Sequence, residues 1–118
     1  MVVPAEMANG AQTRNEASAG LSQDGAIRCT VELYGMARLL AKSAKVELAV
    51  PAPAVISSVF VALARELPVL VGPVIAPDRG KLTSGYACNI NGLDFVRDPG
   101  FKINPGDSII IISNDAGG

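Results

Sequence analysis

Strict alternation of apolar and polar residues marks two stretches near the start of the chain. In residues 27–33 every odd position is apolar and every even position is Arg, Thr or Glu, and residues 45–50 repeat the alternation. A period of two is typical of a half-buried β-strand. Gly35 ends the first stretch, and residues 36–42 are a short run of good helix formers. We therefore expect two neighbouring strands joined by a short helical turn.

The period changes beyond Pro53. The apolar residues are then Val55, Ile56, Val59, Phe60, Leu63 and Leu67. This spacing is typical of one face of an amphipathic helix, so residues 54–67 are predicted to form the one substantial helix, with Pro53 near its first turn. No Ser, Thr or Asp stands as an obvious N-cap. Residues 68–83 form a long connection rich in Pro and Gly, and its Val and Ile residues are expected to pin it to the body of the domain.

A hairpin is the clearest local signal in the sequence. Alternating apolar residues from Tyr86 to Ile90 are followed by Asn91-Gly92 and then by residues 93–96. Asn-Gly favours a type I′ turn because both residues tolerate positive φ. Two later segments, 98–100 and 104–107, place Pro ahead of Gly, a pattern that predicts type II turns.

Four consecutive isoleucines, residues 109–112, form the centre of a last predicted strand over residues 108–113. Such a run suits a strand that is buried on both faces or that lies inside the sheet. The element order is therefore strand, strand, helix, hairpin, strand. We expect an α+β fold in which a mixed, curled sheet packs on one main helix and the last strand lies centrally beside the first.

Composition limits the classes of function. The chain has 118 residues, of which 49% are hydrophobic, enough for one domain with its own core. Residues 1–25 have no hydrophobic period and are predicted to be a disordered extension, which leaves 26–118 as the domain. The net charge of −1 offers no electrostatic footprint for nucleic acid or an anionic membrane. No stretch is typical of a secretory signal or a membrane span, so a cytoplasmic location is expected.

The sequence contains no histidine, which removes the commonest general base and metal ligand. Cys29 and Cys88 lie far apart without a metal-ligand or redox spacing. We expect both to be buried and inert, and we expect no metal site. A self-contained hydrolase is therefore not indicated.

The last six residues follow the isoleucine strand and end on Gly117-Gly118. Glycine has no Cβ, so such a tail fits a channel too narrow for other residues and leaves the terminal carboxyl carbon open to approach. Six extended residues span about 20 Å at most. The alternative is an idle, frayed end, and Gly-Gly alone does not exclude it.

Several segments together resemble a known family, the β-grasp sulfur carriers of the MoaD/ThiS type, with the small subunit of molybdopterin synthase most similar. The segments are residues 34–39, 55–63, 90–93 and 105–111, followed by Gly117-Gly118. The resemblance covers residues 27 to 118 and implies a ubiquitin-like β-grasp fold with a flexible Gly-Gly tail.

This resemblance implies that Gly118 is the reacting residue. An adenylyltransferase resembling ubiquitin-activating enzymes would use ATP to activate its carboxylate, and a persulfide protein would convert it to a thiocarboxylate. The chain itself would bind no cofactor. Within a partner's tunnel Gly117 and Ala116 would give clearance, and Asp115 and Asn114 would either form hydrogen bonds or remain solvated.

The implied acceptor is the large subunit of molybdopterin synthase or another sulfur-accepting enzyme, as in thiamin or cysteine synthesis. The protein would then be a carrier or co-substrate, at most a synthase subunit without a catalytic base. Two other hypotheses stay open: a ubiquitin-like modifier joined through Gly118 to lysine, and an interaction domain with an inert tail. The exposed sheet face with Phe95 or Phe101 is the expected docking surface, and Arg38, Arg65 and Arg97 are expected to be surface charges, one of which pairs with an acidic partner patch.

Overall fold

The structure, a computed structural model, describes residues 25–114. The predicted disordered extension, residues 1–25, therefore lies outside the described residues except for Gly25. The elements are β2 (Ile27–Leu33), α2 (Gly35–Ala41), β3 (Lys45–Val50), α3 (Ile56–Glu66), the 3₁₀ helix η3 (Pro68–Leu70), β4 (Tyr86–Ile90), β5 (Asp94–Val96) and β6 (Ser108–Ser113).

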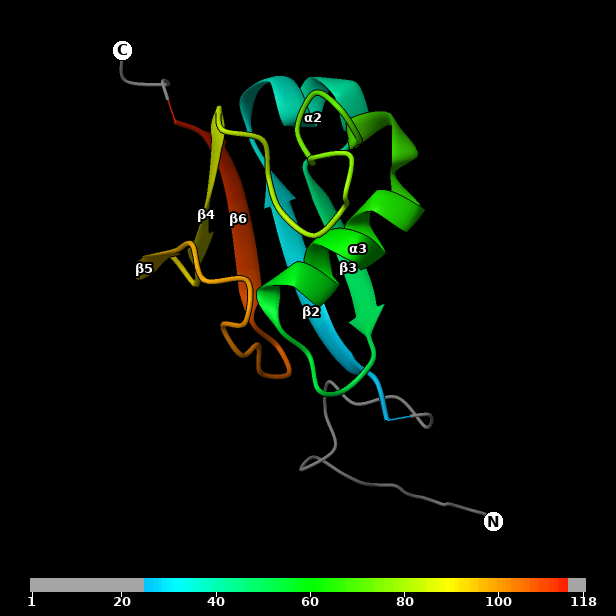
Figure 1. The fold of residues 1–118 in the computed structure, drawn as a ribbon, viewed down its shortest axis with the longest axis vertical. Helices are drawn as coiled ribbons and strands as arrows, with labels where there is room; N and C mark the ends of the chain where they lie inside the picture. The colour runs from blue at the N-terminus through cyan, green and yellow to red at the C-terminus, as the bar shows by residue number, and fades with distance from the viewer. Residues whose placement is uncertain (1–24, 115–118) are drawn as a thin grey trace.

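Five strands form one mixed sheet in the order β3-β2-β6-β4-β5 (Figure 1). β6 is parallel to β2 and antiparallel to β4, while β2 and β3 pair antiparallel. The C-terminal strand thus lies at the centre beside the first strand, as the sequence predicted. This topology, with the main helix crossing between the two hairpin-like halves, is the β-grasp arrangement.

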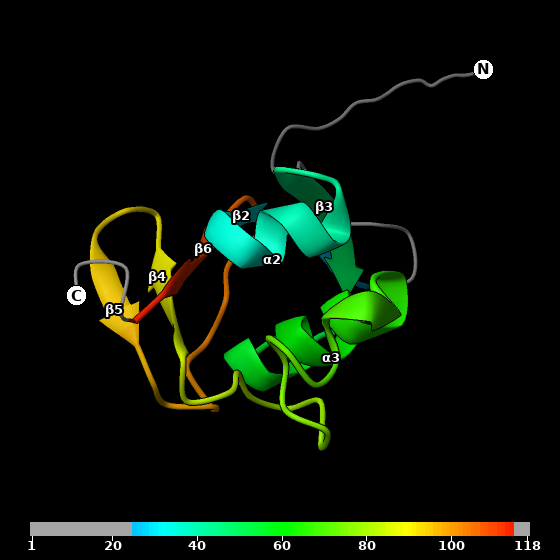
Figure 2. The same cartoon turned by 90° about the horizontal axis from the view of Figure 1, so that it is seen from above.

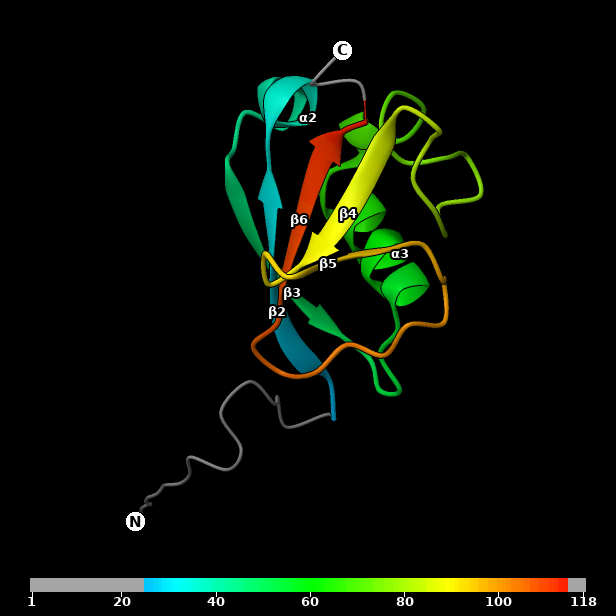
Figure 3. The ribbon, with the colours of Figure 1, turned by 90° about the vertical axis from the view of Figure 1, so that its left-hand side faces the viewer.

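One face of the sheet is covered and the other is not. The odd positions of β2 and the alternate isoleucines Ile109 and Ile111 are buried. They pack in one core cluster with Val59, Phe60 and Leu63 of α3. Figure 2 shows both α-helices on this side of the sheet, and Figure 3 shows the opposite, outer face of β2, β6 and β4 without a covering helix.

The four isoleucines are therefore not buried on both faces. Ile110 and Ile112 are only half-buried, because they point to the outer face of a strand that lies inside the sheet. Of the two predicted situations, the strand inside the sheet is therefore correct, and burial on both faces is not.

The main helix, α3, is shorter than the predicted range of 54–67. It begins at Ile56 and ends at Glu66. Val55 is the N-cap residue in an extended conformation and bridges to Lys102. The N-terminal end of the helix is capped by one of its own residues. The hydroxyl of Ser58 accepts a hydrogen bond from the N–H of Val55 at 3.0 Å. This bond is one half of a capping box and satisfies a free donor at the helix start, while the valine side chain has no acceptor to form the other half.

The long connection is pinned to the domain as expected. Leu70, Val74 and Ile75 are fully buried, and Ile75 forms bridges to both Val71 and Leu82. Its apolar residues therefore extend the core around the end of α3 and hold residues 80–84 close to the sheet.

Three turns test the Gly-based predictions. Asn91 and Gly92 have φ of 58° and 73°, and Leu93 donates to the carbonyl of Ile90, which confirms the type I′ turn. Gly106 has φ of 85°, in keeping with type II. Gly100 has no positive φ, so the first predicted type II turn is wrong.

Asp98 explains the difference. Its Oδ1 accepts the N–H of Gly100 at 2.9 Å, and its carbonyl accepts the N–H of Phe101. This Asx-type bond fixes the turn through the aspartate side chain, without the positive φ that a type II turn requires.

Candidate functional site

The base of the C-terminal tail is fixed to the sheet by Asn114. Its N–H donates to the carbonyl of Gly85 at 2.8 Å, and its Nδ2 donates to the carbonyls of Ser84 at 2.7 Å and Tyr86 at 3.2 Å. These bonds extend the pairing of β6 with β4 by one residue. The tail therefore starts from a defined point at the end of the central strand.

The predicted site residues Gly118, Gly117, Ala116 and Asp115 lie outside the described residues. Asn114 does not behave as either sequence-based expectation had it, because its amide is used inside the domain. An asparagine directly after an isoleucine strand carries no sequence signal for this role. Only the position of the Ser84–Tyr86 carbonyls reveals it.

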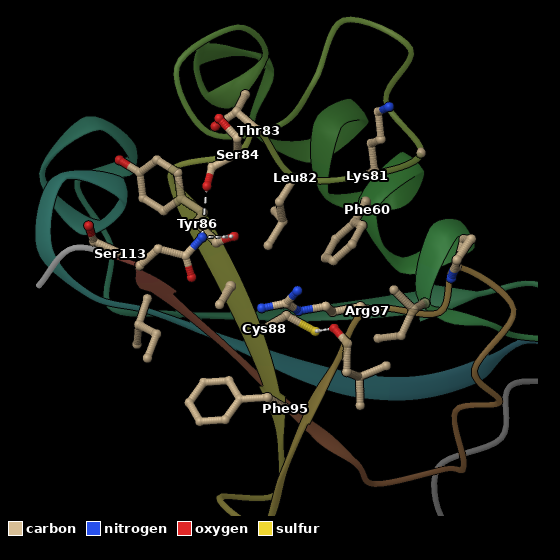
Figure 4. A pocket seen from close by; sticks show the side chains of 17 residues that line it. Phe60, Lys81, Leu82, Thr83, Ser84, Tyr86, Cys88, Phe95, Arg97 and Ser113 are labelled. Carbon is tan, nitrogen blue, oxygen red and sulfur yellow. Dashed lines mark hydrogen bonds between the residues drawn. The ribbon is translucent and has the colours of Figure 1, made fainter.

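A cleft of about 670 Å³ opens beside this anchored residue (Figure 4). Phe60 of α3 and Leu82 of the connection point into it, with Cys88 and Val96 also in its lining. Asn114 lies at its margin. The cleft is thus an opening in the edge of the domain that reaches the apolar core.

The cleft exists because β5 is short. β5 pairs with the Cys88–Ile90 part of β4 only, and the chain then turns away at Asp98 and Pro99. Proline cannot donate to a ladder, so it cannot continue an internal strand pairing. The segment from Ser84 to Ala87 is left beside open space instead of a neighbouring strand.

The charged side chains that line the cleft are both cations. Arg97 extends across it beside Cys88, while the Lys81 ammonium points outward from the rim (Figure 4). Among the described residues, 25–114, no acidic side chain lines the cleft. Within residues 25–114 neither cation has an ion-pair partner. Asp98, next to Arg97 in the sequence, instead accepts the N–H of Gly100.

The outer sheet face carries an apolar patch around one amide. Asn89 pairs with Phe95 on β5 and Ile110 on β6, and Ala87 and Ile112 lie at the next positions of that face. Phe95 is 63% exposed, whereas Asn89 is only 9% exposed. Its Oδ1 is buried and accepts no hydrogen bond from any residue between 25 and 114. An unsatisfied buried acceptor costs free energy, and a donor from outside could reach this one only if the surrounding side chains moved.

Glu32 links the outer face of β2 to the start of β6. Its carboxylate accepts hydrogen bonds from the Ser108 hydroxyl at 2.9 Å and the Tyr34 hydroxyl at 3.0 Å. These two bonds, with that of Ser108 first, lower the pKa of Glu32 below its ordinary value of 4.5. Glu32 in turn raises the pKa of Tyr34. The larger cause is the hydrogen bond of the Tyr34 hydroxyl to the carboxylate, and the second is the negative charge of Glu32.

We expect the stabilising effect of Glu32 to depend on pH. Because its folded-state pKa is lowered, the contribution is complete above the unfolded-state pKa and is lost as pH falls through the folded-state pKa. The difference in unfolding free energy between wild type and Glu32→Gln should therefore shrink when urea titrations move from neutral pH to below 4.5. Glu66→Gln, on an exposed carboxylate at the end of α3, controls for the lost charge. A difference that stays constant across this range would contradict the assignment.

Both cysteines are buried, as predicted. Burial raises the pKa of Cys29 to about 11, with the negative charge of Asp107 as a smaller cause. Burial also raises the pKa of Cys88 to about 11, although its thiol donates to the Val96 carbonyl at 3.7 Å. The thiolate is the reactive form, so neither thiol is prepared to carry sulfur.

Iodoacetamide should therefore leave the folded protein unmodified. At pH 8 a pKa near 11 leaves roughly one thiol in a thousand ionised. Intact mass should show no adduct in the folded protein and two adducts in concentrated urea. Rapid modification of either thiol in the folded state would instead identify a reactive cysteine.

Within residues 25–114 no group of three or more His, Cys, Asp or Glu side chains is arranged to hold a metal ion. No helix in the same range is long and apolar enough to cross a membrane.

The fold is similar to several solved structures. Small archaeal modifier protein 1 from Haloferax volcanii matches at 23% identity and a TM-score of 0.67, over 77% of this chain and 99% of that one. The protein of the same name from Methanosarcina acetivorans matches at 20% identity and 0.63, over 79% and 98%. The HVO 2177 protein of Haloferax volcanii matches at 18% and 0.62, over 94% and 100%.

No protein-family model matches the sequence, and neither does any curated protein. At these identities the structural neighbours establish the fold alone. The chain has the ubiquitin-like β-grasp fold, and the match covers almost the whole length of each of these neighbours.

Proposed function

We propose that the protein is a sulfur carrier whose C-terminal Gly118 is converted to a thiocarboxylate. The observation that carries the proposal is the anchoring of Asn114, the residue directly before the tail. β6 is the central strand, and Asn114 forms three hydrogen bonds to the carbonyls of residues 84–86, where the chain enters β4. The four residues that follow end in Gly-Gly and span about 13 Å when extended. A rigid body with a short, slender terminal segment suits delivery of a terminal group into another protein.

The chemistry requires activation, because a carboxylate resists nucleophiles. Its oxygen attacks the α-phosphorus of ATP, which releases pyrophosphate and forms an acyl adenylate at Gly118. A protein persulfide then attacks the acyl carbon and expels AMP, which leaves an acyl disulfide. A thiol then attacks the sulfur of the donor's cysteine in that acyl disulfide. The outer sulfur stays on Gly118 as the thiocarboxylate, and the donor's cysteine leaves in a new disulfide with the thiol.

Binding of ATP and acid–base chemistry belong to partners in this proposal. The chain lacks histidine, and both thiols are buried. We assign adenylation to an enzyme resembling ubiquitin-activating enzymes and sulfur supply to a persulfide protein.

We assign docking of the activating enzyme to the outer-face patch of Ala87, Asn89, Phe95, Ile110 and Ile112. Phe95 is largely exposed there, while Phe101 is 37% exposed. Asn89 lies in the middle of the patch, with its Oδ1 buried and without a donor from residues 25–114. Exposed aromatic residues around a desolvated polar group are typical of protein interfaces.

Within this class we propose the small subunit of molybdopterin synthase, with the large subunit as sulfur acceptor. The support is the sequence resemblance in residues 34–39, 55–63, 90–93 and 105–111. Carriers for thiamin or cysteine synthesis use the same activation and differ in the acceptor.

A second candidate is a ubiquitin-like protein modifier. The observation that favours it is the fold similarity to two proteins named small archaeal modifier protein 1. In that case the activated Gly118 acyl group would pass to a lysine amine and form an isopeptide bond.

The test mixes the full chain with ATP, an activating enzyme of this type and a persulfide donor, beside a chain that lacks Gly118. Intact mass should rise by the exchange of one oxygen for sulfur in wild type only. Conjugates of higher mass on denaturing gels, without the thioacid, would select the modifier. Neither product with an enzyme that is competent on another carrier would overturn both candidates.

A further inference from the structure

The cleft beside Asn114 adjoins the outer-face patch, because Ala87, Phe95 and Ile112 belong to both. The proposed chemistry makes no use of the deeper part of the cleft around Phe60, Leu82 and Arg97. Its volume of about 670 Å³ lies within the range of ligand pockets in proteins. Phe60 and Cys88 in its lining are almost completely buried in the core, so an occupant would contact the interior of the domain.

The charge of the cleft limits its occupant. Arg97 crosses the opening (Figure 4). Within residues 25–114 it has no ion-pair partner, and no acidic side chain from that part of the chain lines the cleft. A guanidinium prefers a carboxylate, with which it forms two parallel hydrogen bonds. The floor around Phe60, Leu82 and Val96 is apolar. The fitting group is therefore an aromatic or large aliphatic body with a carboxylate next to it.

The position of the cleft indicates where that group comes from. Asn114 belongs both to the cleft margin and to the tail anchor. The remaining tail reaches about 13 Å, so a protein that receives Gly118 in its active site must bring its own surface close to the cleft. A small free acid would not need this location.

We infer that the cleft between residues 80–84 and 96–99 binds an aromatic side chain flanked by carboxylates, presented by the protein that receives the tail. The contact rests on the proposed function only in naming that protein. An apolar side chain inserted into a pocket gives affinity, and the carboxylate–Arg97 pair gives orientation and faster encounter. Together they would hold the tail in line with the partner's active site.

The direct test uses a small probe, the acetylated and amidated tripeptide Glu-Phe-Asp, titrated into the full-length ¹⁵N-labelled chain. Amide shifts should saturate with a dissociation constant of about 1 mM and should cluster at Lys81 to Ala87 and at Arg97. Arg97→Glu should weaken binding at least about tenfold, because it replaces an attraction by a repulsion. Arg65→Glu makes the same charge change at the end of α3, outside the cleft, and should bind like wild type. The peptide Lys-Phe-Lys should not shift these amides.

Several results would overturn the inference. One is the absence of saturable shifts at the cleft, and another is equal binding of the Lys-Phe-Lys peptide. Octanoate that binds as tightly as the acidic peptide would make the cleft a small-molecule site. Shifts that depend on protein concentration alone would make it a contact between copies.

A second readout links the cleft to transfer. In the thiocarboxylation reaction, Arg97→Glu should raise the KM for the carrier about tenfold and leave kcat near wild type, whereas Arg65→Glu should change neither. A normal KM for Arg97→Glu would exclude the activating enzyme as the source of the bound side chain. If wild type forms no thiocarboxylate but binds the acidic peptide in the cleft, the proposed function fails and the peptide site stands. If thiocarboxylate forms and no peptide binds, the proposed function stands and the peptide site fails.

Discussion

Gly117→Val is expected to reduce thiocarboxylate formation at Gly118 on the order of 100-fold, the scale associated with misplacing a reacting group by about 1 Å. Valine adds a branched side chain directly before the reacting carboxylate, and it disfavours the positive φ values open to glycine. A channel that admits the Gly-Gly terminus would exclude it. The measurement is the initial rate by intact mass with wild type and variant side by side.

Two controls separate this effect from damage to the domain. Asp115→Asn changes the same tail without adding bulk and keeps the capacity for hydrogen bonds, so it should react at close to the wild-type rate. Gly117→Val should also leave the unfolding free energy unchanged, since the core cluster lies between Ile27 and Ile111. A variant that reacts as fast as wild type would show that the tail does not enter a narrow channel.

Ile111→Ala should destabilise the domain by about 2–5 kcal/mol, as for other isoleucines that are fully buried. Ile111 has no exposed surface and lies on the central strand, opposite Leu33 on one side and Cys88 on the other. The truncated side chain would leave a cavity that neighbours on both sides cannot close. Equilibrium urea denaturation measures the loss.

The neighbouring residue provides a matched control. Ile110 is on the same strand and is only half-buried on the outer face. Ile110→Ala should cost clearly less, because solvent fills the space and no closed cavity forms. Equal losses for the two variants would contradict the assignment of core and outer faces to β6.

Local patterns sufficed for most of the fold. The alternation in residues 27–33 and 45–50 predicted β2 and β3 because the side-chain period of a strand is visible within the strand itself. Asn91-Gly92 predicted the type I′ turn because its positive φ values are a property of those two residues. The helix start and the turn at Gly100 were less accurate, since the bonds of Ser58 and Asp98 compete with the simpler propensities.

The candidate site divides in the same way. The chemistry proposed at Gly118 comes from the sequence alone, and its residues lie outside the described part of the chain. The sequence also indicated buried, inert thiols, because cysteines without partner spacing behave as small apolar residues. Phe95 was expected on a docking face, and its exposure agrees with that placement.

The set of elements, the central place of the last strand and the Gly-Gly terminus follow from period, turn chemistry and order along the chain, whereas the β-grasp fold was implied by the family resemblance. The hydrogen bonds of Asn114, the lack of a donor to Asn89 Oδ1 within residues 25–114 and the position of Arg97 could be read only from the tertiary structure. Each depends on residues distant in sequence: Asn114 on the carbonyls near Gly85, and the Arg97 cleft on the early end of β5 beside the 80–84 segment. Such sites form from the spaces between elements, and no pattern within a single element encodes them.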